Sequence, residues 1–206
     1  MTTRAPQLLW LEDDRALAVA EAAGGLASGG VVVFPTDTVY GLLGLSTSAE
    51  AYRETYRIKG RAGQRPLQLL VAAMSTFAAQ VQLMLAPHGL LGDEFRAGRL
   101  TVVVGEHALP GLPRQVGELQ PGPVGVRCPA HPELQQVLTT VGADLPLWAT
   151  SANASESAPC TDAAAVQSWL AAAVVRPSLT VLSRQPTASV PSRVVRLENR
   201  SVAYLR

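Results

Sequence analysis

Short apolar runs alternate along the chain with stretches in which apolar residues recur at helical spacing. Runs of mostly β-branched residues predict strands, and apolar residues spaced three and four apart predict amphipathic helices. We expect strands at 31–34, 42–45, 67–71, 100–104, 124–127 and 147–149, with three more short ones toward the C-terminus. We expect helices from Asp13 or Asp14 up to Gly29, at 48–59, at 75–91 with a break at Pro87, at 132–141 and at 162–174.

This alternation predicts an α/β fold. The short strands near the end favour a mixed sheet over a purely parallel one. A length of 206 residues and a hydrophobic fraction of 48% are typical of one large globular domain, so we expect a single domain over 1–206. The Gly/Pro-rich stretch 105–122 between two strands is interpreted as a loop long enough to suspect a function.

A cluster of oxygen-bearing side chains directly follows the strand at 31–34. Pro35 ends this strand because proline cannot donate to a sheet ladder, and Thr36, Asp37 and Thr38 come next. They would lie at the carboxyl end of the strand, where open α/β sheets bind their ligands. The same residues are also good turn formers, so an ordinary capped turn is the alternative.

Two further positions carry polar groups at predicted strand ends. Ser151 and Asn153 are two positions apart, so in extended backbone both side chains would point to the same side and could bind one ligand. A turn ahead of the next helix is the alternative. Arg127 ends another strand, and its planar guanidinium could hold a carboxylate.

Lys59 is the only lysine among 17 basic residues. Because the chain uses arginine wherever a general surface cation suffices, a lone lysine suggests a site that needs a compact ammonium group. Arginines at 53, 57, 61 and 65 surround it, and Glu54 is the one acid among them. Such clustered cations suit a polyphosphate or a nucleic-acid backbone, which we favour over a solvated helix face or chance.

Charge and composition argue against several other classes. A net charge of +1 gives no general attraction to a polyanion. No run of about 18 apolar residues predicts a membrane span, and the first residues lack the features of a signal peptide, so we expect a cytoplasmic protein. Cys128 and Cys160 are interpreted as structural thiols. Cys128 and His131 alone are too few ligands for a structural metal, so none is expected.

Five short motifs together carry a resemblance to a known family. They are Pro35-Thr36-Asp37-Thr38-Val39-Tyr40-Gly41-Leu42, Lys59-Gly60-Arg61, Pro66-Leu67, Val126-Arg127-x-Pro129-x-His131-Pro132 and Ser151-Ala152-Asn153. In order and spacing the chain resembles the YrdC-type threonylcarbamoyl-AMP synthase family from Asp14 to Arg206. The resemblance implies a YrdC-like twisted mixed β-sheet flanked by helices, with a deep positively charged cavity.

The resemblance also implies a nucleotidyltransferase. In this family L-threonine, bicarbonate and ATP, with Mg²⁺, become L-threonylcarbamoyladenylate and pyrophosphate, and other proteins use the product to complete the threonylcarbamoyladenosine modification of tRNA. Such a reaction needs positioning and charge compensation rather than an enzyme nucleophile. By resemblance, the catalytic residues are Lys59 and Arg61, the nucleotide is bound by Lys59, Arg61, Arg65, Ser151, Asn153 and Arg206, and threonine is bound by Thr36, Thr38, Arg127 and Ser192.

A helix-end side chain in a solvated cavity contributes little to the core. We therefore expect replacement of Lys59 by arginine to reduce turnover with little change in stability.

The chain departs from the family motifs at several places. Arg96-Ala97-Gly98-Arg99 stands where the family shows Trp-Pro-Gly-Pro, Arg65 where it shows Lys or Asn, and Arg193 where it shows Thr. These departures keep three alternatives open. They are a non-catalytic RNA-binding paralogue that holds tRNA with help from the arginines at 193, 196 and 200, a relative with a different acceptor, and a carbamoyl-transfer module like that of hydrogenase maturation proteins.

Overall fold

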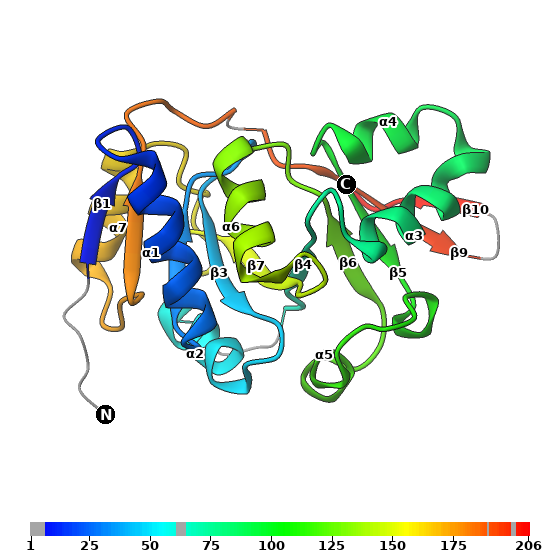
Figure 1. Ribbon diagram of the computed structural model, residues 1–206, viewed down its shortest axis with the longest axis horizontal. Coiled ribbons are helices and arrows are strands. Elements are labelled where there is room, and N and C mark those ends of the chain that lie inside the picture. The colour runs from blue at the N-terminus through cyan, green and yellow to red at the C-terminus, as the bar shows by residue number, and fades with distance from the viewer. Residues whose placement is uncertain (1–6, 61–64, 189, 199–200) are drawn as a thin grey trace.

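One mixed β-sheet forms the centre of the molecule, with helices on both faces (Figure 1). The computed structural model describes residues 7–60, 65–188, 190–198 and 201–206. Within these ranges ten strands form the sheet in the order β1-β8-β2-β3-β7-β4-β6-β5-β9-β10. The strands are β1 (Gln7–Trp10), β2 (Val31–Phe34), β3 (Gly41–Leu45), β4 (Gln68–Leu70), β5 (Leu100–Val104), β6 (Val124–Arg127), β7 (Leu147–Ser151), β8 (Leu179–Leu182), β9 (Arg193–Glu198) and β10 (Ser201–Tyr204).

Parallel and antiparallel pairs both occur in this sheet. β2 pairs in parallel with β8, and β4 pairs in parallel with β6. β3 runs antiparallel to both of its neighbours, β2 and β7. The prediction of an α/β fold with a mixed sheet is therefore confirmed.

Four of the described helices begin directly after a capping Asp or Ser side chain. Asp14, Ser48, Ser75 and Asp162 each accept a hydrogen bond from a backbone N–H of the first turn that follows. The helices are α1 (Arg15–Ala27), α2 (Ala49–Lys59), α3 (Thr76–Leu85), α4 (Leu91–Arg96), α5 (Arg114–Leu119), α6 (Pro132–Gly142) and α7 (Ala163–Ala172). None of the described helices is long and apolar enough to cross a membrane.

Strand β2 is buried on both faces, as its unbroken apolar run predicts. Val32 and Phe34 pack in the core layer that also contains residues of α1 and α6, which lie side by side (Figure 1). Val31 and Val33 pack in the opposite layer with residues of α2 and α7. The end of β2 is thus held between two layers, and the polar residues that follow it start from a rigid position.

The structure corrects two local interpretations. The stretch 105–122 is not one irregular loop, because it contains the 3₁₀ turn η2 (Glu106–Ala108) and the short helix α5. Neither has a side-chain cap, so the sequence carries no start signal for them. Strand β1 was not expected, and its position at the sheet edge comes from parallel pairing with β8, which is distant in sequence. The break expected at Pro87 is confirmed by the 3₁₀ turn η1 (Ala86–His88).

Candidate active site

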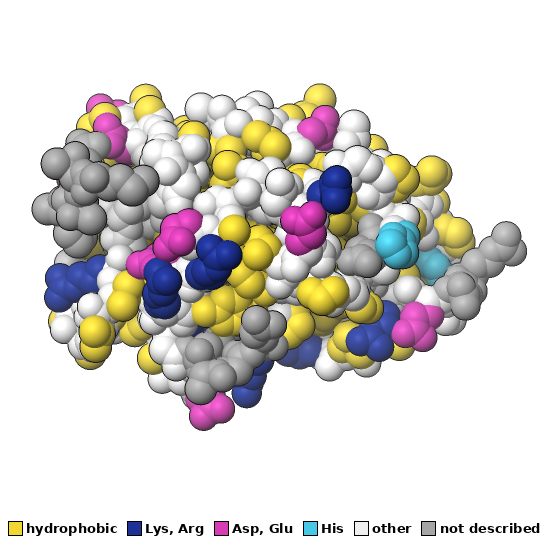
Figure 2. Space-filling view, turned by 90° about the horizontal axis from the view of Figure 1, so that it is seen from below, with side chains coloured by type: hydrophobic (Ala, Val, Ile, Leu, Met, Phe, Trp, Pro, Cys, Tyr) yellow, Lys and Arg dark blue, Asp and Glu magenta, His cyan; other side chains and the backbone are white. Residues whose placement is uncertain are grey.

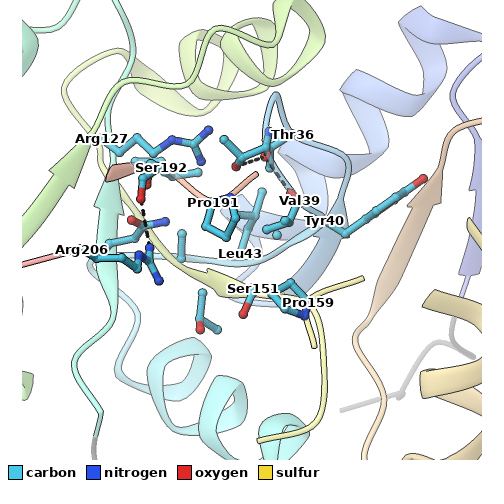
Figure 3. A pocket seen from close by; sticks show the side chains of 16 residues that line it. Thr36, Val39, Tyr40, Leu43, Arg127, Ser151, Pro159, Pro191, Ser192 and Arg206 are labelled. Carbon is cyan, nitrogen blue, oxygen red and sulfur yellow. Dashed lines mark hydrogen bonds between the residues drawn. The ribbon is translucent and has the colours of Figure 1, made fainter. Parts of the chain in front are cut away.

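A cavity of about 110 Å³ opens beside the ends of β2, β3 and β7 (Figure 3). Six of the residues expected at the site line it, namely Thr36, Thr38, Arg127, Ser151, Ser192 and Arg206. Ser192 belongs to the segment between β8 and β9, which crosses the molecule from one half of the sheet to the other (Figure 1). We call this space the inner cavity. Its charged lining residues among the described ones are Arg127 and Arg206.

The turn after β2 is formed by its own hydroxyl groups. Thr36 Oγ1 donates to the carbonyl of Val39 at 2.7 Å and accepts the backbone N–H of Thr38 at 3.1 Å. The two threonine hydroxyl oxygens lie 3.1 Å apart, and both residues are buried. The turn interpretation and the binding interpretation are therefore compatible, because the hydroxyls that shape the turn also face the inner cavity.

Arg127 is held by acceptors from two other segments. Its Nε donates to the carbonyl of Gly98 at 2.9 Å, and its Nη2 donates to Asp37 Oδ1 at 2.7 Å. Burial lowers the pKa of Arg127, and the Asp37 carboxylate opposes that effect. The guanidinium keeps Nη1 and one hydrogen of Nη2 outside these two hydrogen bonds. It can still receive a carboxylate at that end.

Lys59 lies inside the protein, contrary to the expectation of a solvated position. The residue is 2% exposed, and its ammonium donates to the backbone carbonyl of Ser151 at 2.7 Å and to Asn153 Oδ1 at 2.5 Å. The hydroxyl of Ser151 donates to the same amide oxygen at 2.7 Å. Lys59, at the end of α2, thus contacts the backbone of Ser151 and the side chain of Asn153, and the two side chains bond to each other. Their binding of one common ligand stays a prediction. Arg61, expected next to it, lies outside the described residues.

Ser192 and Arg206 meet at the other side of the inner cavity. The hydroxyl oxygens of Ser192 and Thr101 lie 2.8 Å apart, and Thr101 also donates to Gln68 Oε1 at 3.1 Å. Arg206 Nη2 donates to the carbonyl of Ser192 at 3.1 Å (Figure 3). The sequence held no signal for Gln68 or Thr101, because they join the site only through the pairing of their strands with β6.

The cations around Lys59 do not form one patch among the described residues. Arg57 is exposed and bonds to Glu50 at 3.1 Å and Glu54 at 2.9 Å. Arg65 is exposed and lies 3.7 Å from Glu156. On the face drawn in Figure 2, basic side chains are scattered among acidic and apolar ones. Among the described members of the expected anion-binding cluster, Lys59 is the buried one, and Arg61 lies outside the described residues.

Comparison with known proteins assigns the chain to a family. Residues 25–206 match the model of the Sua5/YciO/YrdC family, which carries the description "Telomere recombination". The chain belongs to the Sua5/YciO/YrdC family. The resemblance inferred from the sequence motifs is thus confirmed.

Individual relatives agree with this assignment. A Mycobacterium tuberculosis relative is 33% identical over 160 residues, which are 77% of this chain and 70% of the relative. The Bos taurus protein named "Threonylcarbamoyl-AMP synthase" is 36% identical over 146 residues, 71% of this chain but 49% of the relative, so this chain spans about half its length. A variant of P. abyssi Sua5 superposes with a TM-score of 0.77 at 25% identity, covering 97% of this chain and 59% of that one.

Three residues that depart from the family motifs line a second cavity. This cavity has a volume of about 530 Å³ and shares Thr38, Pro191 and Ser192 with the inner cavity. Ala97, Arg99 and Arg193 line it, and Arg193 forms an ion pair with Glu94. None of the departures at 65, 96–99 and 193 lines the inner cavity of this Sua5/YciO/YrdC member.

Proposed function

We propose that this chain synthesises L-threonylcarbamoyladenylate from L-threonine, bicarbonate and ATP, with release of pyrophosphate. The observation that carries the proposal is the inner cavity, which is lined by six of the ten site residues named from the family resemblance. The name of the bovine relative supports the same activity. In this proposal the product supplies the threonylcarbamoyl group for tRNA modification, which other proteins complete.

The inner cavity suits the amino acid better than the nucleotide. Its volume of about 110 Å³ is below the range of about 300–1,000 Å³ usual for larger ligands. In the proposed complex, Arg127 receives the threonine carboxylate, and hydroxyl groups of Thr36, Thr38 and Ser192 surround the amino acid. ATP lies past Ser151 and Arg206, with its phosphates toward the end of β7, where the Lys59 ammonium donates to the carbonyl of Ser151.

The phosphates would be met by Lys59 and Arg61, with Asn153 holding the ammonium of Lys59 in place. Mg²⁺ would arrive with ATP as part of the substrate. The carboxylate beside the inner cavity, Asp37, is already paired with Arg127. The described residues contain no group of three or more His, Cys, Asp or Glu side chains that could hold a metal ion.

The reaction divides into two steps with no covalent enzyme intermediate. Bicarbonate condenses with the threonine amine and releases water, and the resulting carbamate oxygen attacks the α-phosphorus of ATP while pyrophosphate leaves. The protein positions the reactants and compensates charge on the phosphates. Burial raises the pKa of Cys128, and raises that of Cys160 to about 11, so neither thiol is an activated nucleophile.

The test is pyrophosphate release by the purified protein with Mg²⁺, ATP, bicarbonate and L-threonine. We expect pyrophosphate and a product with the mass of threonylcarbamoyladenylate, both absent when threonine or bicarbonate is left out. A panel of the other amino acids tests the alternative of a different acceptor. Background pyrophosphate with every amino acid, despite measurable ATP binding, would overturn the proposal.

The RNA-binding alternative receives no support from surface charge. Arg193 pairs with Glu94, Arg196 lies 3.4 Å from Glu198, and Arg200 lies outside the described residues. Paired arginines attract a polyanion weakly, because each positive charge has a negative one beside it.

A further inference from the structure

In the described part of the chain, Asp37 is the one carboxylate bonded to Arg127. Its Oδ1 accepts from Arg127 Nη2 at 2.7 Å, and the two side chains are 17% and 4% exposed. The carbonyl of Gly98 takes the adjacent Nε. The edge of the guanidinium formed by Nε and Nη2 is thereby occupied, which fixes the plane of the group. Its outer end, with Nη1 and the second hydrogen of Nη2, is left for a ligand.

Gly98 allows this close approach. Its φ is +72°, and a Cβ placed there would lie 1.9 Å from Asp37 Oδ2 and 2.8 Å from the backbone N of Ala130. A side chain at position 98 would therefore push the carboxylate away from Arg127. Three segments distant in sequence converge so that Asp37 can reach the guanidinium.

The charge of Asp37 determines what the outer end of Arg127 attracts. Alone, a buried guanidinium is an uncompensated cation that favours any anion of suitable size. With Asp37 the pair is neutral overall, and Arg206, the other charged residue lining the inner cavity, donates to the carbonyl of Ser192 instead. A simple carboxylate that binds Arg127 therefore adds a negative charge close to Asp37. A zwitterion brings its own positive charge and adds none.

We propose that Asp37 is a positioning and specificity-determining residue, which makes the acceptor site select a zwitterionic α-amino acid over a simple carboxylate of similar shape. The inference rests on the proposed function, because it assumes that the acceptor carboxylate meets Arg127. It assigns to Asp37 a role beyond the turn that it helps to form.

The experiment compares two ligands by equilibrium binding to the wild-type protein and to Asp37→Asn. The ligands are L-threonine and 3-hydroxybutanoate, which is threonine without its amino group. We expect the wild type to prefer threonine by tenfold or more, and the substitution to reduce this preference by about tenfold, since asparagine keeps the acceptor oxygen and removes the charge. A purely structural role would weaken both ligands equally and leave their ratio unchanged, which would overturn the inference.

Glu94→Gln is the matched control. Glu94 borders the second cavity and pairs with Arg193, so its loss removes a carboxylate near the site without touching Arg127. We expect this variant to keep the wild-type ratio. The inference would be overturned if the preference for threonine over 3-hydroxybutanoate fell equally in Asp37→Asn and Glu94→Gln. A general loss of negative charge would then explain the change in preference.

Two further outcomes separate the inference from the proposed function. Should Asp37→Asn not fold, Asp37→Ser carries the same expectation, because its shorter side chain leaves room for water beside Arg127. A wild type that binds threonine, with an unchanged ratio in the Asp37 variants, overturns the inference alone. A wild type that binds no threonine and releases no pyrophosphate overturns the proposed function as well.

Discussion

Lys59 is the residue whose buried ammonium group is proposed to contact the phosphates of ATP. Its burial changes what replacement by arginine is expected to do. A broader guanidinium must fit a position that is 2% exposed and satisfied by a backbone carbonyl and an amide oxygen. Overpacking of a filled site costs typically about 1–3 kcal/mol. We therefore expect Lys59→Arg to lower the stability of the fold, in place of the small change expected for a solvated lysine.

We predict that Lys59→Arg lowers the rate of pyrophosphate release by about a hundredfold, because the wider cation displaces positive charge from the phosphates. The free energy of unfolding should fall by about 1–3 kcal/mol. Steady-state kinetics and thermal unfolding measure the two effects. Near-normal turnover would mean that the lone lysine is an accident of composition and that Arg61 carries the phosphate role.

Arg57→Lys is the control for this variant. Arg57 lies on the same helix but is exposed and paired with Glu50 and Glu54. Its stability change should stay within about ±0.5 kcal/mol and its turnover should match the wild type. A large loss in the control would show that α2 as a whole, rather than the buried ammonium, is sensitive to change.

Arg127→Lys tests the amino-acid side of the site. A lysine cannot keep the hydrogen bonds to Gly98 and Asp37 while presenting two donors to a carboxylate. We expect the affinity for L-threonine to fall about tenfold or more, with a much smaller change for ATP. Calorimetric titration with each ligand measures this. Equal loss of both affinities would assign Arg127 to the fold or to the nucleotide.

At the scale of elements, α6 begins at a histidine that has to be neutral to cap it. His131 Nδ1 accepts the backbone N–H of Leu134 at 3.4 Å, and burial lowers the pKa of this histidine from its ordinary value of 6.5, although Glu133 and Asp37 act against this. The unfolded chain therefore binds a proton at a higher pH than the folded one. The free energy of unfolding should fall as the pH drops below 6.5, and level off once the folded protein is protonated too.

His131→Asn should remove this part of the pH dependence, because asparagine caps helices and does not titrate. Urea midpoints at about pH 7.5 and about pH 5.5 measure it, and the difference between them should shrink in the variant. An unchanged difference in His131→Asn would place the titrating group elsewhere.

At the scale of the whole molecule, charge is balanced both in total and locally. The net charge is +1, and several exposed arginines pair with neighbouring acids. We predict that unmodified tRNA binds more weakly than about 10 µM at physiological salt and does not displace a fluorescent ATP analogue. Tight RNA binding that weakens steeply with added salt would contradict this and restore the RNA-binding alternative.

Local patterns in the sequence determined most elements of this fold. The apolar run at 31–34 marks β2, and Asp14 and Ser48 mark the starts of α1 and α2. These signals can be read because capping and periodicity depend on residues within a few positions of one another. The motifs also identified the family, and they contain four of the expected site residues that line the inner cavity, namely Thr36, Thr38, Arg127 and Ser151.

Only the tertiary structure decided how those residues are engaged. Asp37 and Arg127 are 90 positions apart, and Lys59 and Asn153 are 94 apart, so their pairing depends on the order of strands in the sheet. The same order placed β1 at an edge and joined Gln68 and Thr101 to Ser192. Burial of Lys59 follows from the position of the end of α2 beside Ser151, at the end of β7, and Asn153, in the turn after it. The presence of a single lysine in the sequence does not predict whether that lysine is buried or exposed.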